Sequence, residues 1–329
     1  MVARVACLSP YEEGTIRAMF KGRHEVEVTV APPPPDQPAV MAACAEADLV
    51  IADRRHRHRI DRPVLERMRR CRLIQQAAVG FDSIDHRAAA EYGIPVANAA
   101  GYNKDSVADW TVMAMIALLR GSFRLDRQLR AGHWHGEELM RGDETLGHEL
   151  GAMTVGIVGM GNVGSAVARR LAPFGCRIVY ADALRRTVYG ATQVDLDTVL
   201  ATSDIVCVHA PLDVETRALI GAQELARMKQ SAYLINAARG PIVDQKALVA
   251  ALSAGRLSGA ALDVFEVEPL PHDSPLRSLE NVILAPHRGG ATVEADARLL
   301  EVVGDNLLRV LDGEPPLNVV NGLTAARAL

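Results

Sequence analysis

The apolar residues of this chain recur in two alternating patterns. Short apolar runs predict buried strands, and the stretches between them, where apolar residues follow a helical period, predict helices. Over the first third of the chain the predicted strands are residues 3–8, 25–30, 48–52 and 73–77, and the main helical stretches are 38–47 and 62–70. Strands that alternate with helices are typical of a parallel α/β sheet.

Residues 106–120 form the strongest helical pattern. Apolar side chains surround most of this predicted helix, so we expect it to be largely buried, with Gly121 as its stop. Residues 121–150 then become polar and contain several glycines. They predict a long irregular connection, which either separates two domains or reaches across to a second subunit.

The alternation of strands and helices resumes in the second half. The predicted strands are 154–158, 177–181, 204–208, 232–236, 259–262 and 282–284, and a closing helix is expected over 294–311. Short strands with helices between them fit a doubly wound sheet. Because domains run about 100–200 residues, a chain of 329 residues is expected to hold two of them.

Composition and charge narrow the class of protein. Hydrophobic residues make up 49% of the chain, enough for buried cores, and the net charge of −4 argues against a main role in electrostatic binding of nucleic acid. No secretory signal and no apolar stretch of membrane-spanning length is apparent. The five cysteines form no C-x-x-C pair, and their odd number does not fit a complete disulfide framework. We therefore expect a soluble cytoplasmic protein with reduced thiols and no membrane or nucleic-acid partner.

A glycine fingerprint follows the predicted strand 154–158. Gly159, Gly161 and Gly164 have the spacing G-x-G-x-x-G and open a helical stretch at 165–171. The first glycine permits a tight turn, the second lets the backbone approach a pyrophosphate, and the third allows close packing of helix on strand. The N-terminus of the helix then offers N–H groups to the phosphates.

An acidic residue stands where this fingerprint requires one. Asp182 ends the next predicted strand, close to the expected distance of about 20 residues. A carboxylate there accepts hydrogen bonds from the adenosine ribose and repels a 2′-phosphate, which favours NAD over NADP. Arg185 and Arg186 follow closely, so NADP stays open as an alternative.

Five further motifs occur in a fixed order. They are V-G-x-D-x-I-D at 79–85, H-x-P-L-x-x-x-T at 209–216, N-x-x-R-G at 236–240, D-V-F-x-x-E-P at 263–269 and P-H-x-G-G at 286–290. The last three lie at the carboxyl ends of predicted strands, where open α/β sheets bind their ligands.

Together these motifs resemble the D-isomer-specific 2-hydroxyacid dehydrogenase family over nearly the whole chain. The resemblance implies two doubly wound parallel-sheet α/β domains with the active site between them. A Rossmann NAD-binding domain, residues 103–292, would be inserted in a flavodoxin-like substrate-binding domain made of residues 1–102 and 293–329. It also implies a homodimer, built on the cofactor domain and residues 121–150.

The resemblance also implies that Arg239, Glu268 and His287 are catalytic. Oxidation of a 2-hydroxy acid removes a hydroxyl proton and a hydride, and His287 can take that proton or return it to a keto acid, because imidazole exchanges protons near neutral pH. A carboxylate at Glu268 would stabilise the imidazolium. The guanidinium of Arg239 would bind the keto oxygen and the carboxylate of the substrate.

Two sets of binding residues are expected. The cofactor set comprises Gly159, Gly161, Asn162, Val163, Asp182, His209, Ala210, Pro211, Thr216, Ala237, Ala238, Arg239, Asp263, His287 and Gly290. Within it, the resemblance implies that Asp263 contacts the nicotinamide carboxamide. The substrate set comprises Arg55, Val79, Gly80, Arg239 and His287. Backbone N–H groups around Val79 and Gly80 would hold the substrate carboxylate.

Residues 53–59 form the densest basic run of the chain. They follow a predicted strand, and the matching loop of the family lines the active-site cleft. Arg54 or Arg55 would then pair with a second anionic group on the substrate. The alternative is a solvated loop with no role in binding.

Two weaker features complete the survey of candidate chemistry. The H-x-H pairs His56/His58 and His133/His135 lack a nearby cysteine or third ligand, so no metal site is expected. The chain departs from the usual family pattern at Arg288, where an aliphatic residue is common, and at Ala237 and Ala238, where a hydroxyl residue is common. Neither departure removes a catalytic group.

The predicted function is hydride transfer between NAD(H) and a small D-2-hydroxy acid or 2-keto acid. The substrate would resemble hydroxypyruvate and glyoxylate, or phosphoglycerate. One alternative is an NAD(H)-sensing binding protein, because the family has corepressor relatives with the same fold and catalytic residues. A second alternative is an NAD-dependent formate dehydrogenase, which Glu268 argues against, because those enzymes carry Gln at that position.

Overall fold

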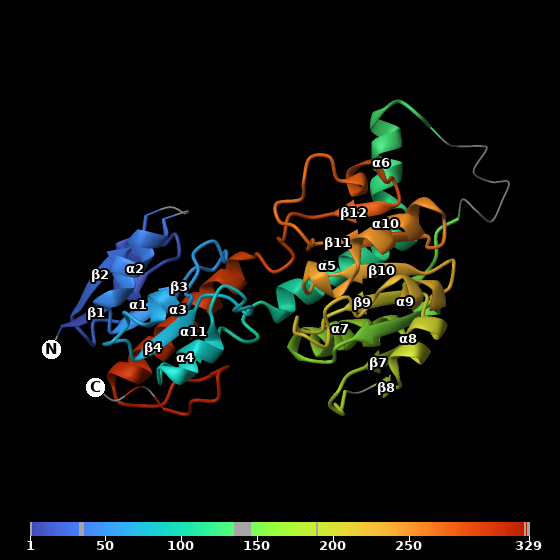
Figure 1. Cartoon of the computed structure of the whole chain (residues 1–329). Helices are drawn as coiled ribbons and strands as arrows, with labels where there is room; N and C mark the ends of the chain where they lie inside the picture. The colour runs from blue at the N-terminus through green and yellow to red at the C-terminus, as the bar shows by residue number, and fades with distance from the viewer. Residues whose placement is uncertain (1, 33–35, 135–145, 189, 326, 328–329) are drawn as a thin grey trace. The chain divides into compact units, whose positions relative to one another are not determined.

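The chain divides into two compact units, shown in a computed structural model (Figure 1). Unit 1 comprises Met1–Asn103 and Thr292–Leu329, and unit 2 comprises Lys104–Ala291. The structure describes residues 2–32, 36–134, 146–188, 190–325 and 327. From sequence we placed the two junctions at 102/103 and 292/293.

Unit 1 is a parallel sheet covered by helices on both faces. Its strands have the order β2-β1-β3-β4-β5. They are β1 (Ala3–Cys7), β2 (Val26–Val30), β3 (Leu49–Ala52), β4 (Leu73–Gln76) and β5 (Val96–Ala97). The helices are α1 (Glu13–Met19), α2 (Gln37–Ala45), α3 (Arg62–Leu65), α4 (His86–Glu91) and α11 (Val293–Leu311). This strand order is the flavodoxin-like one, and that prediction is confirmed.

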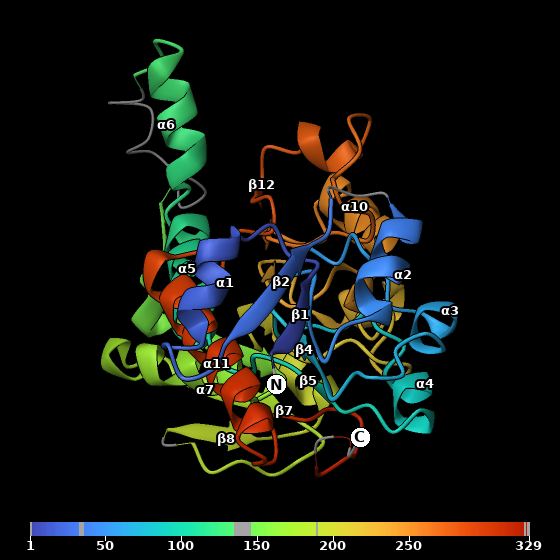
Figure 2. The same ribbon diagram turned by 90° about the vertical axis from the view of Figure 1, so that its left-hand side faces the viewer.

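Two apolar cores lie on the two faces of this sheet. Residues of α1 and α11 form one core with alternate residues of β1, β3 and β4, and residues of α2, α3 and α4 form the other (Figure 2). All four residues of β3 are buried, as expected for a central strand that is covered on both sides. The continuous apolar run that predicted this strand is therefore explained.

Unit 2 is a larger doubly wound sheet with the strand order β12-β11-β10-β9-β6-β7-β8. Its strands are β6 (Thr154–Val158), β7 (Arg177–Ala181), β8 (Ala191–Gln193), β9 (Ile205–Val208), β10 (Tyr233–Asn236), β11 (Gly259–Leu262) and β12 (Val282–Leu284). Its α-helices are α5 (Lys104–Leu119), α6 (Ser122–Arg130), α7 (Asn162–Leu171), α8 (Leu196–Thr202), α9 (Ala222–Arg227) and α10 (Gln245–Ser253). Short 3₁₀ turns are η3 (Leu150–Ala152), η4 (Ala172–Phe174), η5 (Gly240–Ile242) and η6 (Pro275–Ser278). The doubly wound prediction is confirmed.

The strand order of unit 2 fixes where a ligand can bind. Chain order runs outward from β6 in both directions, with β7 on one side and β9 on the other. In open α/β sheets the crevice for ligands lies at the carboxyl ends of the strands beside such a reversal. The fingerprint loop after β6 lies at this point.

The structure differs from the prediction in the connection that follows α5. A helix, α6, occupies Ser122–Arg130 where we expected an irregular segment, and it projects from the rest of unit 2 (Figures 1 and 2). It has no buried residue, and its sequence is mostly polar, so we did not expect a helix there. The expected burial of α5 holds on one face only, because Met113 and Ile116 are 41% and 39% exposed. Residues 135–145 of the predicted connection, His135 among them, lie outside the described residues.

Short elements account for the other differences. Strands β5 and β8 have two and three residues and were not predicted, because so few positions carry no period. Helix α3 ends at Leu65, within the predicted stretch 62–70.

Among the described residues, no helix is both long enough and apolar enough to cross a membrane.

Gly164 provides a test of the packing around the fingerprint. A Cβ on Gly164 would lie 2.2 Å from the carbonyl oxygen of Gly159, so Gly164→Ala must push α7 away from β6. We expect this substitution to lower the free energy of unfolding by about 1–3 kcal/mol. Gly14, in α1, is the matched control, because a Cβ there meets nothing within 4 Å. Gly14→Ala should raise stability by roughly 0.5–1 kcal/mol through helix propensity. Chemical denaturation of both variants checks the two signs, and equal stability of Gly164→Ala and wild type would contradict the packing argument.

Candidate active site

The glycine loop of unit 2 brings two strand ends close together. Gly159 follows β6 with a φ of 93°, and a Cβ there would lie 2.5 Å from the backbone nitrogen of Ala210. The turn therefore requires glycine both for its dihedral angle and for its contact with the segment after β9. Helix α7 begins directly afterwards at Asn162, so its first N–H groups lie beside this loop and can bind a pyrophosphate.

Asp182 holds the glycine loop in place. Its Oδ2 accepts a hydrogen bond from the N–H of Met160 at 2.7 Å, and its Oδ1 accepts one from the N–H of Leu184 at 2.8 Å. The carboxylate thus ties the end of β7 to the fingerprint. Asp182 remains partly exposed, and carboxylate oxygens can accept more than one hydrogen bond, so a ribose hydroxyl can still bind there.

His209 contributes an unsatisfied polar ring to the same edge. Both of its ring nitrogens are buried and have no hydrogen-bond partner within the described part of the chain. Burial lowers the pKa of His209 to about 4, so the ring is neutral at pH 7. A buried ring without partners is costly unless a bound group completes it. This orphaned ring and the side-chain-free cradle at Gly159 both fit a dinucleotide.

Thr216 stabilises the turn after β9. Its hydroxyl donates to the carbonyl of Pro211 at 2.7 Å and accepts from the N–H of Asp213 at 2.8 Å. The contact keeps Pro211 near the strand end, in the segment that the glycine loop approaches. The predicted cofactor residues 209–216 therefore lie on one ordered turn.

The predicted catalytic residues follow three neighbouring strands. Arg239 lies after β10, Glu268 after β11 and His287 after β12, and these strands pair in parallel, so their carboxyl ends share one edge. His287 Nδ1 and Glu268 Oε2 are 2.7 Å apart, with both side chains more than a third exposed. The structure thus brings Glu268 and His287 into direct contact.

Glu268 is held as a carboxylate. Its Oε1 accepts the N–H of Phe265 at 3.0 Å, which fixes the orientation of the side chain. Partial burial opposes ionisation, but the hydrogen bond and charge of His287, the Phe265 N–H and the charge of Arg239 outweigh it, and the pKa of Glu268 falls below its usual value. A carboxylate on Nδ1 leaves Nε2 of His287 to exchange a proton with a substrate.

The backbone around Arg239 is packed tightly against the segment that carries Glu268. A Cβ on Gly240 would lie 1.9 Å from the carbonyl carbon of Phe265, so only glycine fits there. The Asn236 side chain donates to the carbonyl of Arg239 at 3.0 Å and accepts the N–H of Ala238 at 3.1 Å. These contacts fix Ala238 and Arg239 beside the Glu268 loop.

Asp263 shapes the loop that presents His287. Its two carboxylate oxygens accept the N–H groups of Arg288 at 2.7 Å and of Gly289 at 2.8 Å, and its carbonyl accepts the N–H of His287 at 2.8 Å. Burial raises the pKa of Asp263, although these amides oppose it. His287 itself adopts a φ of 53°, a conformation that the surrounding hydrogen bonds maintain. The side chain of Arg288 is exposed, and Gly290 follows in the same loop.

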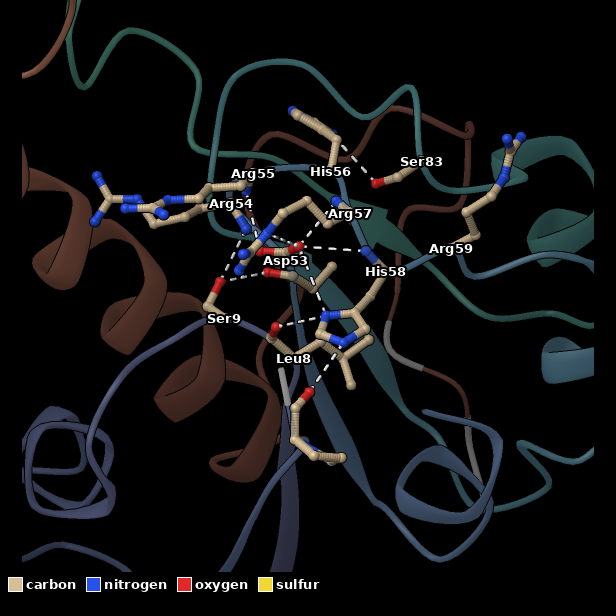
Figure 3. Close-up of polar contacts among 12 residues, drawn as sticks. Leu8, Ser9, Asp53, Arg54, Arg55, His56, Arg57, His58, Arg59 and Ser83 are labelled. Atoms are coloured by element: carbon tan, nitrogen blue, oxygen red, sulfur yellow. Dashed lines mark hydrogen bonds and ion pairs between the residues drawn. The ribbon is translucent and has the colours of Figure 1, made fainter. Parts of the chain in front are cut away.

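The basic run of unit 1 is organised around one buried carboxylate (Figure 3). Asp53 is fully buried and accepts the N–H groups of Arg55, Arg57 and His58 at 3.1, 2.9 and 3.2 Å. His58 is also buried, and its ring nitrogens lie 3.0 and 3.2 Å from the carbonyl oxygens of Leu8 and Pro32. The loop is therefore an ordered turn rather than a loose solvated segment.

Arg54 and Arg55 differ in their surroundings. Arg54 donates to Asp296 at 2.7 Å and to the hydroxyl of Tyr11 at 3.2 Å, and its guanidinium lies 5.7 Å from the centre of the Tyr11 ring. Arg55 is exposed, extends away from Asp53 and has no side-chain partner within the described residues (Figure 3). Of the two candidates, Arg55 is thus the one with an uncommitted guanidinium. The Asp296 partner of Arg54 lies far away in the sequence, and no local pattern indicates it.

Val79 and Gly80 lie on the loop after β4 in unit 1. Val79 is 38% exposed, and the side chain of Asn98 donates to its carbonyl at 2.7 Å. His56 and His58, in the same unit, contact Ser83 and backbone carbonyls. Within the described ranges, no group of three or more His, Cys, Asp or Glu side chains is placed to hold a metal ion.

Comparison with known proteins agrees with this arrangement. The family model described as the NAD-binding domain of D-isomer specific 2-hydroxyacid dehydrogenases matches residues 112–289. A glyoxylate reductase of Korarchaeum cryptofilum is 44% identical over 266 residues, which is 80% of each chain. A glyoxylate/hydroxypyruvate reductase B of Yersinia pestis is 38% identical over 88% of each chain.

A solved structure agrees at the level of the fold. The D-isomer specific 2-hydroxyacid dehydrogenase of Lactobacillus delbrueckii ssp. bulgaricus, in its NAD-complexed form, superposes with a TM-score of 0.78. It is 26% identical and covers 96% of this chain and 99% of its own. The resemblance found in the sequence motifs is therefore confirmed. The chain is an NAD(P)-dependent oxidoreductase and belongs to the D-isomer specific 2-hydroxyacid dehydrogenase family.

Proposed function

We propose that this dehydrogenase reduces a small 2-keto acid of the glyoxylate or hydroxypyruvate kind with NADH. The contact between His287 Nδ1 and Glu268 Oε2 beside a dinucleotide fingerprint carries this proposal, because it pairs a proton donor with a cofactor site at one sheet edge. The names of the curated relatives add support for the substrate class.

Several residues of unit 2 have separate roles in the proposed reaction. NADH, when bound, supplies the hydride to the keto carbon. His287 donates its Nε2 proton to the keto oxygen, which becomes the hydroxyl of the product, and Glu268 stabilises the imidazolium before that transfer. Arg239 binds the keto oxygen and the substrate carboxylate through its guanidinium. In unit 1, the backbone N–H groups at Val79 and Gly80 are proposed to hold the carboxylate.

NADH is the proposed preferred cofactor. Asp182 lies at the end of β7, where its carboxylate would bind the ribose hydroxyls and repel a 2′-phosphate. Asp263 is proposed to contact the nicotinamide carboxamide in addition to holding the His287 loop. An assay of keto-acid reduction distinguishes the three candidate functions. Neither an NAD(H)-sensing binding protein nor a formate dehydrogenase is expected to reduce a keto acid with NADH.

Replacement of His287 tests the proton donor. We expect His287→Ala to lower kcat with glyoxylate or hydroxypyruvate by roughly 10²–10⁴-fold, because the general acid is lost, while NADH still binds. NADH oxidation followed at 340 nm measures the rate, and fluorescence titration measures the affinity. His272→Ala is the matched control, since His272 is exposed in the same unit and should retain wild-type turnover. Near-normal kcat in His287→Ala would overturn the assignment.

The substrate's distal group is proposed to bind Arg55. Since Arg54 is paired with Asp296, Arg55 is the one of these two arginines whose guanidinium is uncommitted among the described residues. A substrate with a second acidic or strongly polar group would gain a charge-assisted hydrogen bond there. Such substrates should then outperform pyruvate.

Arg55→Ala tests this specificity. We expect the variant to lower kcat/KM for a 2-keto dicarboxylate by about tenfold or more, since a hydrogen bond to a charged group contributes roughly 1.5–3 kcal/mol, and to leave pyruvate unchanged. Arg59→Ala is the control, because Arg59 is exposed on the other side of the same loop (Figure 3). If pyruvate is the best substrate of the wild type, or if both variants behave alike, Arg55 has no role in specificity.

A homodimer is proposed to form through α5 and α6. Apolar side chains on these helices are exposed: Met113, Ile116, Phe123, Leu125 and Leu129. Beside them, unit 2 contains a cavity of about 540 Å³, lined by Trp110, Phe123, Leu276 and Ile283 among others. A helix without buried residues that carries apolar side chains needs a covering surface, and a second copy of the chain supplies one.

Phe123→Glu tests the dimer. We expect wild type to sediment as a dimer and Phe123→Glu as a monomer at micromolar concentration, because a carboxylate would be buried in the interface. Phe174→Glu is the control, since Phe174 is equally exposed, at 45% against 46%, but lies on η4. A monomeric wild type, or an unchanged Phe123→Glu variant, would contradict this interface.

A further inference from the structure

His58 is a buried histidine whose two ring nitrogens both face carbonyl oxygens. Only 3% of its side chain is exposed. Nδ1 lies 3.0 Å from the carbonyl oxygen of Leu8, which directly follows β1, and Nε2 lies 3.2 Å from that of Pro32, which follows β2 (Figure 3). A carbonyl oxygen can only accept a hydrogen bond, so each contact requires a hydrogen on the ring nitrogen.

Both contacts of His58 can form only on a doubly protonated ring. A neutral imidazole carries one N–H group and one nitrogen lone pair, so in either tautomer a lone pair would point at one of the two carbonyl oxygens. A buried acceptor that lacks its donor is costly, and the imidazolium satisfies both carbonyls at once. The hydrogen-bond geometry therefore selects the charged form of His58.

Asp53 supplies the opposite charge. Its carboxylate is fully buried, and Oδ2 lies 3.6 Å from Nδ1 of His58 and 3.5 Å from Nε of Arg57. Buried charges are found paired and hydrogen-bonded, because an isolated one is costly to bury. Cys7 of β1 also lies within electrostatic reach of Asp53, but burial raises the pKa of its thiol to about 12, so it stays neutral. In the part of the chain that the structure describes, Asp53 thus forms its ion pairs with His58 and Arg57, and the other two segments contact the His58 ring through backbone carbonyls.

The same carboxylate and ring hold the loop that carries Arg55. Asp53 accepts the backbone N–H groups of Arg55, Arg57 and His58, and the ring of His58 attaches the end of this loop to the segments that follow β1 and β2. Removal of one ring proton would leave one of the two carbonyls without a donor and the charge of Asp53 less compensated. The loop would then be held less firmly, and the exposed side chain of Arg55 would lose its fixed direction.

We propose that His58 is a buried imidazolium and a positioning residue for Arg55. The charge of the ring follows from its own contacts and from Asp53. The effect on specificity rests on the proposed function, in which Arg55 binds a distal acidic group of the substrate. The preference for a 2-keto dicarboxylate over pyruvate is then highest at low pH, where the ring holds both protons, and falls as rising pH removes one of them.

Nuclear magnetic resonance of the full chain, with ¹⁵N in the histidine rings, tests the charge. At pH 7 we expect two ring N–H signals from His58 that exchange slowly with water, because the ring is buried. The exposed ring of His272 is the internal reference, in which this exchange is fast. Magnetisation transfer from the ring hydrogens to the side chain of Leu8 assigns the signals, so no substitution is needed. A single ring N–H on His58 at pH 7 would mean a neutral ring, and the proposal would be wrong.

Hydrogen exchange of the backbone tests the positioning role without reference to any substrate. His58→Gln removes the charge and keeps a hydrogen-bonding side chain. His56→Gln is the matched control on the same loop, because the ring of His56 contacts the Ser83 hydroxyl, which can donate or accept. We expect the amides of residues 54–58 to exchange about fivefold faster or more in His58→Gln, since opening of their hydrogen bonds governs exchange, and to be unchanged in His56→Gln. Equal exchange in the two variants would contradict the positioning role.

A pH profile of specificity tests the link to the substrate. The measured quantity is kcat/KM for a 2-keto dicarboxylate divided by kcat/KM for pyruvate, between about pH 5 and 8, where histidine is the side chain that ordinarily changes charge. Because His287 acts on both substrates, its own titration cancels in this ratio. In the wild type and in His56→Gln we expect the ratio to fall by about fivefold or more as the pH rises, since a charge-assisted hydrogen bond is lost. In His58→Gln it should be low at every pH.

Arg55→Ala separates this proposal from the function on which it rests. If Arg55→Ala abolishes the preference for the dicarboxylate but the wild-type ratio does not change with pH, Arg55 binds the substrate and the link to His58 is wrong. If Arg55→Ala leaves the preference unchanged, the proposed contact of Arg55 with the substrate is wrong. The ring signals and the amide exchange then still decide the charge and the positioning role of His58.

Discussion

The parallel pairing of the strands in unit 2 is the constraint on which the rest of the site depends. One row of paired residues crosses the sheet from β12 to β8: Ile283, Ala261, Ile235, Cys207, Ile157, Tyr180 and Gln193. Because every strand runs in the same direction, every loop that follows a strand leaves at the same edge. The fingerprint, Asp182, His209, Arg239, Glu268 and His287 all follow strands of this sheet. Residues that are far apart in the sequence are therefore neighbours, and contacts between their loops, such as those of Asp182 with Met160 and of Glu268 with His287, then fix their positions.

Carboxylates that accept backbone hydrogen bonds then give these loops their shape. Asp182 and Asp263 in unit 2, and Asp53 in unit 1, each accept two or more backbone N–H groups from the turn beside them. An amide bound to a carboxylate is held more strongly than one bound to a neutral oxygen. The same carboxylate can thus hold a loop through backbone hydrogen bonds and also contact a ligand. A carboxylate in a family motif, such as Asp263, can therefore have both roles.

Most of the fold could be predicted from the sequence, because strands buried on both faces leave continuous apolar runs. Strands β7, β11 and β12 have the predicted bounds, and β9 and β10 begin one residue later than predicted. Helix α6 could not be predicted, since none of its residues is buried and its sequence is mostly polar. In the site, motifs indicated His287 and Glu268, but the pairing of Arg54 with Asp296 depends on the return of the chain in α11, which no local pattern reveals.

Adjacent residues on α7 show how tertiary neighbours decide what a charge does. Arg169 and Arg170 are adjacent residues of the same type, yet their side chains leave the helix in directions about 100° apart. Arg170 meets two carboxylates of α5 and stabilises the contact between these helices. Arg169 faces a cavity with no acidic lining, so its charge is available to a ligand. The number of positive charges in a sequence therefore does not indicate an anion-binding site until the partner of each cation is known. Here the partners of Arg170 come from a different helix, α5.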